Sequence, residues 1–237
     1  NINDPDFNFI ALSNSTGINS YVISDTNIAT VVGSNVTIQN LGSTLVTVNQ
    51  AADSNYNSGS STMTLKIITD PVINFDDITK IFGDANFELT PSSTSPAPFT
   101  FTISNTNIAT LSGSNVTIQN TGSTTIFVKQ EAYENFADAS ASIVLTVLKA
   151  EPEIILSEIV KTYGDSDFEI YPTSNSNGQF SFTIENPTIA SINENKVSIL
   201  EAGVTTIITT QASERNYNSR SIKTLLTVLK ADPVITF

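Results

Sequence analysis

Acidic side chains recur at regular intervals along this sequence. They could bind metal ions, transfer protons or form turns. Asp70 and Glu151 each precede a proline, and Asp84 and Asp165 each follow a glycine. Carboxylate oxygens are hard ligands that suit Ca²⁺. The chain has no EF-hand loop pattern, however, and acids beside proline or glycine are also ordinary turn residues. The sequence therefore leaves two interpretations for these four residues, namely calcium ligands or turn formers.

Catalysis is a further interpretation of the acidic and hydroxyl side chains. A carboxylate pair could hydrolyse glycosides, and a serine beside a lysine could cleave acyl bonds. The chain has no His and no Cys, which removes imidazole acid–base chemistry, thiol nucleophiles and disulfides. It also has no phosphate-binding glycine loop and no nucleophile-elbow pattern. We therefore predict that the chain is not an enzyme and needs no cofactor beyond the calcium considered above.

The charge balance limits the partners of this chain. Its 237 residues carry 23 Asp and Glu against 10 Lys and Arg, a formal net charge of −13 at pH 7. Binding to nucleic acid or to anionic lipid needs a basic face, so neither partner is expected. No apolar stretch is long enough to cross a membrane as a helix. With 39% hydrophobic residues, the chain can still bury cores.

Internal repeats organise the elements that position these side chains. The segment Asp70–Phe75 (DPVINF) recurs as Glu151–Leu156 (EPEIIL) and as Asp232–Phe237 (DPVITF), at intervals of 81 residues. Residues 26–45 and 106–125 match at 16 of 20 positions. Fixed-period similarity indicates tandem structural units. We predict domain 1 over residues 1–69, domain 2 over 70–150 and domain 3 over 151–231, with 232–237 as the first strand of a further unit or as a donor strand.

Each repeat is predicted to be all-β. Short runs rich in Val, Ile, Thr and Phe alternate apolar with polar residues, and turn-forming clusters separate them. About seven strands in 80 residues are typical of an immunoglobulin-like β-sandwich. The strands predicted for the second repeat are 71–75, 87–91, 99–104, 109–112, 115–120, 123–130 and 140–149.

Two kinds of residue recur between the predicted strands. Gly42, Gly122 and Gly203 each precede a Thr-rich strand, where a positive φ angle would explain glycine. An aromatic residue follows Asn at one place in the loop before each last strand. It could stack on a sugar, or it could pack over the end of the sandwich, and recurrence in every copy favours packing. The aromatic residues are Tyr56, Phe136 and Tyr217.

The junctions between repeats are too short for a flexible coil. Only Ala150 and Glu151 separate the predicted last strand of the second repeat from Pro152, which begins the next. Proline is tolerated at the first residue of a strand, and it restricts the backbone there. We therefore predict domains arranged head-to-tail as a semi-rigid rod, with roughly 40 Å for each domain.

The sequence resembles the bacterial immunoglobulin-like repeats of large surface proteins. The motifs that carry the resemblance are Ser104–Leu111 (SNTNIATL), Gly113–Ile118 (GSNVTI) and Gly122–Ile126 (GSTTI). Lys161–Asp165 (KTYGD) and the closing LTVLKA at 145–150 add to it. The resemblance implies a secreted or surface-anchored adhesin or stalk of invasin/intimin-like architecture. It specifies the fold more closely than the function, because the same module serves several roles.

The sequence begins and ends at different points of the repeat. In repeat phase the first copy lacks the equivalent of residues 70–80, while residues 232–237 repeat a first strand. One interpretation is a window taken from a longer array. The other is strand exchange, in which the segment completes the open sheet edge of the next chain and builds a filament. Its predicted donor residues are Pro233, Val234, Ile235 and Phe237.

The sequence thus predicts a non-enzymatic, extracellular stalk or spacer of a surface adhesin. Two alternatives remain open: a filament protomer joined by strand donation, and a carbohydrate-binding module whose site lies in loops such as 92–98 and 174–179. The expected partners are neighbouring repeats or identical chains head-to-tail, with a host or environmental surface or glycan reached through other parts of the protein. Nucleic acid and membrane insertion are not expected.

Overall fold

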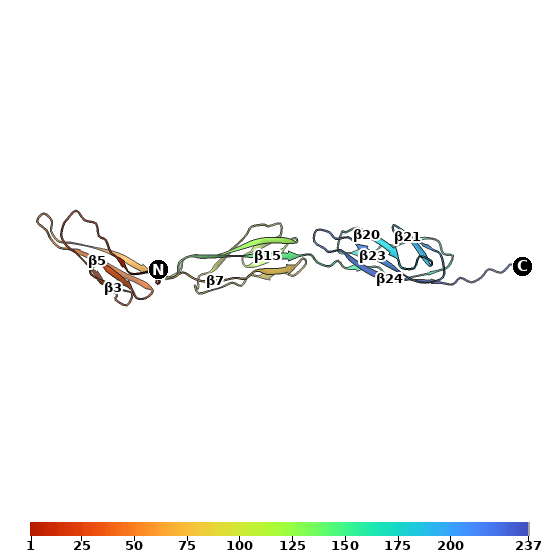
Figure 1. The fold of residues 1–237 in the computed structure, drawn as a ribbon, viewed down its shortest axis with the longest axis horizontal. Helices are drawn as coiled ribbons and strands as arrows, with labels where there is room; N and C mark the ends of the chain where they lie inside the picture. The colour runs from red at the N-terminus through yellow and green to blue at the C-terminus, as the bar shows by residue number, and fades with distance from the viewer. Residues whose placement is uncertain (237) are drawn as a thin grey trace. The chain divides into compact units, whose positions relative to one another are not determined.

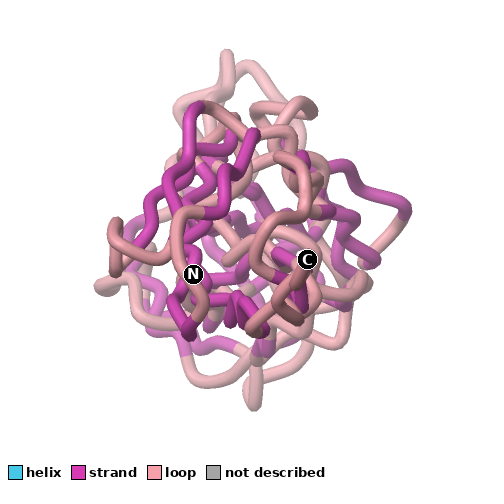
Figure 2. The backbone as a smooth tube through the Cα atoms, turned by 90° about the vertical axis from the view of Figure 1, so that its right-hand side faces the viewer, coloured by secondary structure: helices cyan, strands magenta, loops and turns pink. Residues whose placement is uncertain are grey.

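The chain is all-β in the computed structural model, which describes residues 1–236. Strands and loops account for this whole range, as Figure 2 shows in magenta and pink. Within it, no helix has the length and apolar character needed to cross a membrane. The predicted fold class, tandem immunoglobulin-like β-structure, is therefore confirmed. Phe237 lies outside the described residues.

The first repeat folds into two three-stranded sheets. One has the order β1-β4-β3 and the other the order β2-β5-β6. Both are antiparallel throughout, as alternating strands joined by short turns allow. The strands are β1 (Phe7–Asn8), β2 (Asn19–Ile23), β3 (Ala29–Val32), β4 (Asn35–Ile38), β5 (Gly42–Gln50) and β6 (Gly59–Ile67).

The second repeat adds two elements that the sequence did not predict, β8 and β10. Its sheets have the orders β10-β7, β11-β14-β15-β8 and β12-β13-β9. The strands are β7 (Ile73–Asn74), β8 (Ile78–Ile81), β9 (Phe87–Glu88), β10 (Ser92–Ser93), β11 (Phe99–Ile103), β12 (Ala109–Ser112), β13 (Asn115–Ile118), β14 (Gly122–Gln130) and β15 (Ala139–Leu148). Strand β8 pairs in parallel with β15, so its partner is distant in sequence and no local turn signals it.

The third repeat reproduces this topology. Its sheets have the orders β16-β19, β17-β24-β23-β20 and β18-β22-β21, and β23 and β24 run side by side in Figure 1. The strands are β16 (Ile154–Ile155), β17 (Ile159–Thr162), β18 (Phe168–Glu169), β19 (Thr173–Ser174), β20 (Phe180–Ile184), β21 (Ala190–Asn193), β22 (Lys196–Ile199), β23 (Gly203–Gln211) and β24 (Arg220–Leu229). The same sequence pattern has produced the same pairing twice.

The core of each repeat is formed by every second side chain of its strands. In β24, Leu226 is fully buried while its neighbour Leu225 faces solvent, because successive side chains of a strand point to opposite faces. Leu226 belongs to a core cluster with Ile170, Val197 and Ile207. The corresponding cluster of the first repeat is smaller and contains Ile23, Ala29, Val36 and Val46. Burial of these apolar residues is the main favourable term in folding.

A recurrent glycine starts the long strand of each repeat for a steric reason. Gly122 has a φ of 132°, and a Cβ there would lie 2.8 Å from Cδ1 of Ile108. Gly42 and Gly203 share this positive φ. The prediction that a positive φ explains these glycines is thus correct, and close packing of an isoleucine adds a second reason.

The chain divides into two compact units. One comprises residues 1–76, 89–102 and 126–143, and the other comprises residues 77–88, 103–125 and 144–237. Each repeat of the sequence nevertheless has its own set of sheets. The domain boundaries at residues 69, 150 and 231 and the head-to-tail rod remain predictions.

Candidate functional site: the connectors between repeats

The residues that link successive repeats are held by backbone hydrogen bonds. The N–H of Thr69 donates to the carbonyl of Asn135 at 2.8 Å, and the N–H of Ala137 donates to the carbonyl of Thr69 at 2.9 Å. Ala150 makes the same two bonds with the loop 216–218. Each linker residue thus forms one bridge of a parallel ladder with the loop of the repeat that follows it. A segment held in this way is not a free coil.

The loop of the third repeat also reaches back to the second repeat through Asn216. Its side-chain carbonyl accepts from the N–H of Thr121 at 3.0 Å, and its amide nitrogen donates to Oδ1 of Asn120 at 3.1 Å. The hydroxyl of Thr121 donates to the carbonyl of Arg215 at 2.8 Å. Because an Asn amide offers both donors and an acceptor, this single side chain bonds two neighbouring residues of the second repeat.

An aromatic contact lies beside these hydrogen bonds. The ring of Tyr217 meets the ring of Phe82 edge-on, with centroids 5.6 Å apart and an interplanar angle of 80°. Lys149 donates from Nζ to the carbonyl of Glu214 at 2.6 Å. Edge-on aromatic pairs add stabilisation beyond the area they bury. Tyr217 is thus engaged in packing, while its counterpart Tyr56 in the first repeat is exposed.

The sequence did not predict a functional role for Asn216, although its position recurs in every repeat. Asn55, Asn135 and Asn216 each stand directly before the recurrent aromatic residue. Recurrence marked the position, but Asn is common in turns, so the sequence alone favoured no particular partner. Thr121 carried no signal, because its counterparts at this position differ in chemistry.

The four calcium candidates each accept a hydrogen bond from the protein. Asp84 accepts from the N–H of Ile81 at 2.9 Å, and Asp165 accepts from the N–H of Thr162 at 2.8 Å. Glu151 accepts from Nδ2 of Asn218 at 2.8 Å. These bonds close local turns or fasten a loop, which is the turn interpretation of these acids.

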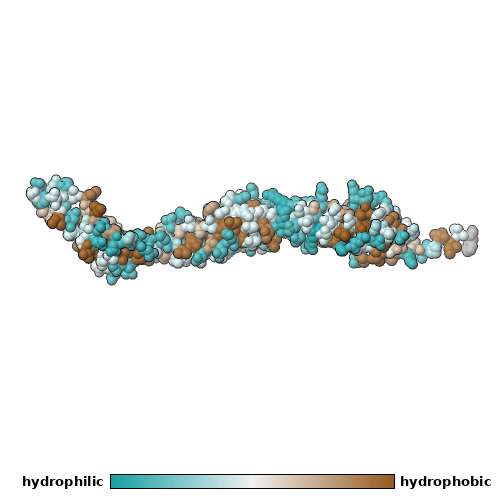
Figure 3. Space-filling view, in the orientation of Figure 1, coloured by the Kyte–Doolittle hydropathy of each residue, from teal (hydrophilic) through white to brown (hydrophobic). Residues whose placement is uncertain are grey.

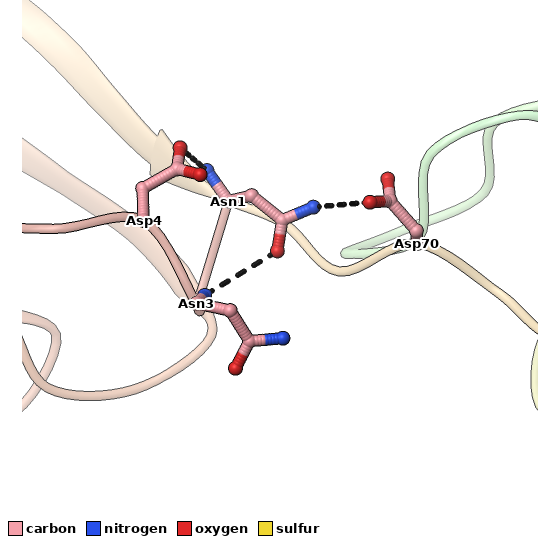
Figure 4. Close-up of polar contacts among 4 residues, drawn as sticks. All are labelled: Asn1, Asn3, Asp4 and Asp70. Carbon is pink, nitrogen blue, oxygen red and sulfur yellow. Dashed lines mark hydrogen bonds and ion pairs between the residues drawn. The ribbon is translucent and has the colours of Figure 1, made fainter.

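Asp70, the fourth candidate, lies beside the first residues of the chain. Its carboxylate accepts from Nδ2 of Asn1 at 2.8 Å (Figure 4). The amino group of Asn1 donates to Asp4 at 2.7 Å, and its Oδ1 accepts from the N–H of Asn3. Among residues 1–236 no three acidic side chains gather as a metal site would require. Calcium binding by the four acids remains a prediction.

A carboxylate fastens the loop before the last strand of the first repeat. Asp53 accepts hydrogen bonds from the backbone N–H of Asn55, from the hydroxyl of Ser15 and from both N–H and hydroxyl of Thr16. The bond from Asn55 is the largest cause, and together these bonds hold the pKa of Asp53 well below its usual range. Glu214 occupies the equivalent place in the third repeat and accepts from the N–H of Asn177.

Two ion pairs lie on the surface of the third repeat. Lys196 contacts Asp167 at 3.0 Å and lowers the pKa of that carboxyl, and Lys223 contacts Glu185 at 2.6 Å with the same effect. All four side chains are well exposed, so each pair contributes little to stability. These four side chains are therefore part of the solvated surface of the third repeat.

The predicted donor strand is exposed where it is described. Residues 233–236 have no strand partner, and Val234 and Ile235 face solvent. Phe237, the last predicted donor residue, lies outside the described residues. The structure therefore leaves strand donation by Pro233, Val234, Ile235 and Phe237 as a prediction.

Comparisons with known proteins concern the fold alone. No family model matches the chain, and no curated protein matches its sequence. Its fold is similar to Drosophila N-cadherin EC1-3, at 13% identity over 94% of this chain and 92% of that chain, with a TM-score of 0.29. It is also similar to the titin I-band fragment I67-I69, at 11% identity over 90% and 88% and a TM-score of 0.35. A third similar structure is that of Sidekick-1 immunoglobulin domains 1-5, at 13% identity over 90% of this chain and 53% of that chain, with a TM-score of 0.35.

Proposed function

We propose that this chain is a non-enzymatic structural segment of an extracellular surface protein, in which tandem immunoglobulin-like repeats act as a stalk or spacer. The connector carries the proposal, because Asn216 ties the third repeat directly to Asn120 and Thr121, which lie in the loop before β14 of the second repeat. A spacer has to transmit position and load between its units. Bonds that join each unit to the next serve that task.

The repeats themselves support the same role. The long-strand sheets of the second and third repeats have the same strand order, β11-β14-β15-β8 and β20-β23-β24-β17. Selection for one binding site would favour differences between copies, whereas selection for spacing favours uniform copies. The resemblance to bacterial surface repeats adds the expectation of an extracellular, cell-surface location.

Stiffness at the connector can be measured because the chain has no cysteine of its own. Spin labels at Ser112→Cys and Ser191→Cys, both exposed positions, report the distance between the second and third repeats. We expect a single narrow distance distribution that broadens with Asn216→Ala. The control is Asn55→Ala, which removes the equivalent residue of the first repeat. A broad distribution in the otherwise unchanged chain would contradict the stalk.

Two roles from the sequence analysis stand beside the stalk. Binding of a host or environmental surface through other parts of the protein is part of the proposed adhesin role. Carbohydrate binding by the loops is the competing role, and specific glycan binding by this chain, lost on replacement of loop 174–179, would favour it. The filament joined by donation of residues 233–237 remains a prediction from the sequence.

A further inference from the structure

The third repeat has a hollow beside strand β18 that is open to solvent. Its volume is about 460 Å³, and small-molecule sites typically have volumes of roughly 300–1,000 Å³. One wall is the segment 155–159, which leads from β16 to β17, and the other is formed by residues 168–171 and Thr173. The two walls are joined because β16 pairs with β19.

Two large apolar side chains of this hollow face solvent. Tyr171 is 70% exposed and Ile155 is 64% exposed. On the third repeat in Figure 3, apolar residues in brown lie beside hydrophilic residues in teal. Because burial of apolar area is favourable, two such side chains beside one hollow provide binding free energy for a ligand.

The second repeat has polar residues at both equivalent positions. At an interval of 81 residues, Thr90 corresponds to Tyr171 and Asn74 corresponds to Ile155. The long-strand sheets of the two repeats have the same strand order, so the fold does not require an aromatic or aliphatic side chain here. Both differences make the same hollow more apolar, which indicates a role particular to the third repeat.

The ring of Tyr171 is held in place by polar contacts. Its hydroxyl donates to the carboxylate of Glu169. This bond is the largest cause that raises the pKa of Tyr171 above its usual value, so the hydroxyl keeps its proton at neutral pH. The N–H of the preceding residue, Ile170, donates to the carbonyl of Asn195 at 2.9 Å. A ring that is already fixed loses little conformational freedom when a ligand binds.

Two carboxylates supply hydrogen-bond acceptors in the hollow. Glu169 keeps acceptor sites after its bond with the tyrosine, since an ionised carboxylate has about four. Within residues 1–236 the carboxylate of Glu158 accepts no hydrogen bond, whereas Asp77, its equivalent in the second repeat, accepts from the N–H of Val144 at 2.7 Å. The hydroxyl of Thr173 adds a group that both donates and accepts.

Both signs of charge border the hollow. The Nζ of Lys161 lies 4.7 to 4.8 Å above an aromatic ring as in the second repeat, and here that ring is Phe168, which lines the hollow. Lys196, which contacts Asp167, is the strand partner of Glu169. An anionic ligand therefore meets carboxylates and a cationic ligand meets ammonium groups. A neutral ligand avoids the cost of placing like charges together.

The hollow is separate from the connectors between repeats. The second repeat contacts the third through Asn120 and Thr121, whose equivalents in the third repeat are Glu201 and Ala202. Neither equivalent lines the hollow. A further repeat joined in the same way would therefore leave the hollow open.

We propose that this hollow binds a neutral sugar unit of a glycan. One face of the sugar ring lies against Tyr171 and Ile155. The sugar hydroxyls bond Glu158, Glu169 and Thr173. A sugar has the matching chemistry, because its ring faces carry C–H groups and its hydroxyls both donate and accept hydrogen bonds. This site differs from the loops 92–98 and 174–179, and it does not depend on the stalk function.

The test is binding of the 237-residue chain to an array of neutral oligosaccharides, with sialylated oligosaccharides and an oligolysine peptide as charged probes. We expect binding to at least one neutral oligosaccharide. Tyr171→Thr, which takes the residue of the second repeat, should weaken this binding at least about tenfold because the ring contact is lost. Tyr163→Thr is the matched control, since it removes an exposed tyrosine of the same repeat outside the hollow and should leave binding unchanged.

A second variant guards against a loss of binding that comes from misfolding. Ile155→Asn changes the opposite wall of the hollow at an exposed position, so it should weaken binding without lowering the melting temperature. No binding to a neutral oligosaccharide, or binding to the charged probes alone, overturns the proposal. Binding that survives Tyr171→Thr and is lost on replacement of loop 174–179 also overturns it, because the loops are then the site.

Discussion

Two adjacent leucines in β24 allow a sharp test of the register of the third repeat. Leu226 has no exposed surface and packs in a core with Ile170, Val197 and Ile207, whereas Leu225 is 41% exposed on the opposite face. Truncating a fully buried leucine to alanine removes its transfer free energy and leaves a cavity, which together cost about 2–5 kcal/mol. The partly exposed leucine loses only part of its burial, so we expect about 1 kcal/mol or less.

The measurement is urea denaturation of the Leu226→Ala chain, the Leu225→Ala chain and the unchanged chain. Tyrosine fluorescence monitors unfolding in each case. A loss of about 3 kcal/mol corresponds to roughly 12–24 °C in Tm for a domain of this size, so calorimetry gives a second measure. Because the two variants have the same composition, differences in intrinsic strand preference cancel. Equal destabilisation, or a larger loss for Leu225→Ala, would refute this register, since a slip of one residue exchanges the two faces.

The remaining predictions concern one turn glycine and one loop carboxylate. Gly122→Ala should cost about 1–3 kcal/mol in urea denaturation, because alanine disfavours a φ of 132° and the Cδ1 end of Ile108, 2.8 Å from the added Cβ, has to move. Gly113→Ala, at a φ of 61° with no atom within 4 Å of the added Cβ, should cost less, and equal costs would contradict this argument. The pKa of Asp53 is lowered in the folded chain, chiefly by the N–H of Asn55, so its stabilising contribution is present above the unfolded-state pKa near 3.8 and is lost as the pH falls below it. Asp53→Asn should therefore flatten the decline of Tm between about pH 4 and pH 2, and an unchanged slope would show that the carboxylate does not stabilise the loop.

Much of the fold follows from local sequence. The alternation in Phe99–Ile103 predicts strand β11, and the period of two also assigns its inward face. The glycine at position 122 is predictable as a turn residue, although the close approach of Ile108 to it involves a residue that is distant in sequence. Strand β8 escaped prediction because its parallel partner β15 is more than 60 residues away in sequence.

The candidate sites were less predictable, because their contacts also join residues that are distant in sequence. The amide of Asn216 acquires a role only when Thr121 and Asn120 lie opposite it, and nothing local to either segment encodes that meeting. The acids Asp84 and Asp165 were recognisable as turn residues or calcium ligands, and their hydrogen-bond partners became visible only in the folded chain.

The sequence by itself determined the repeat, the strands and the identity of the segments DPVINF and DPVITF, because these are properties of residues close together along the chain. Only the tertiary structure decided that the first of these segments pairs with β10 and packs against Phe101. Burial depends on which distant strands pack over a residue, so no local pattern can assign it. A repeated sequence therefore predicts a repeated fold, whereas the exposure of each side chain is set by the packing of its own copy.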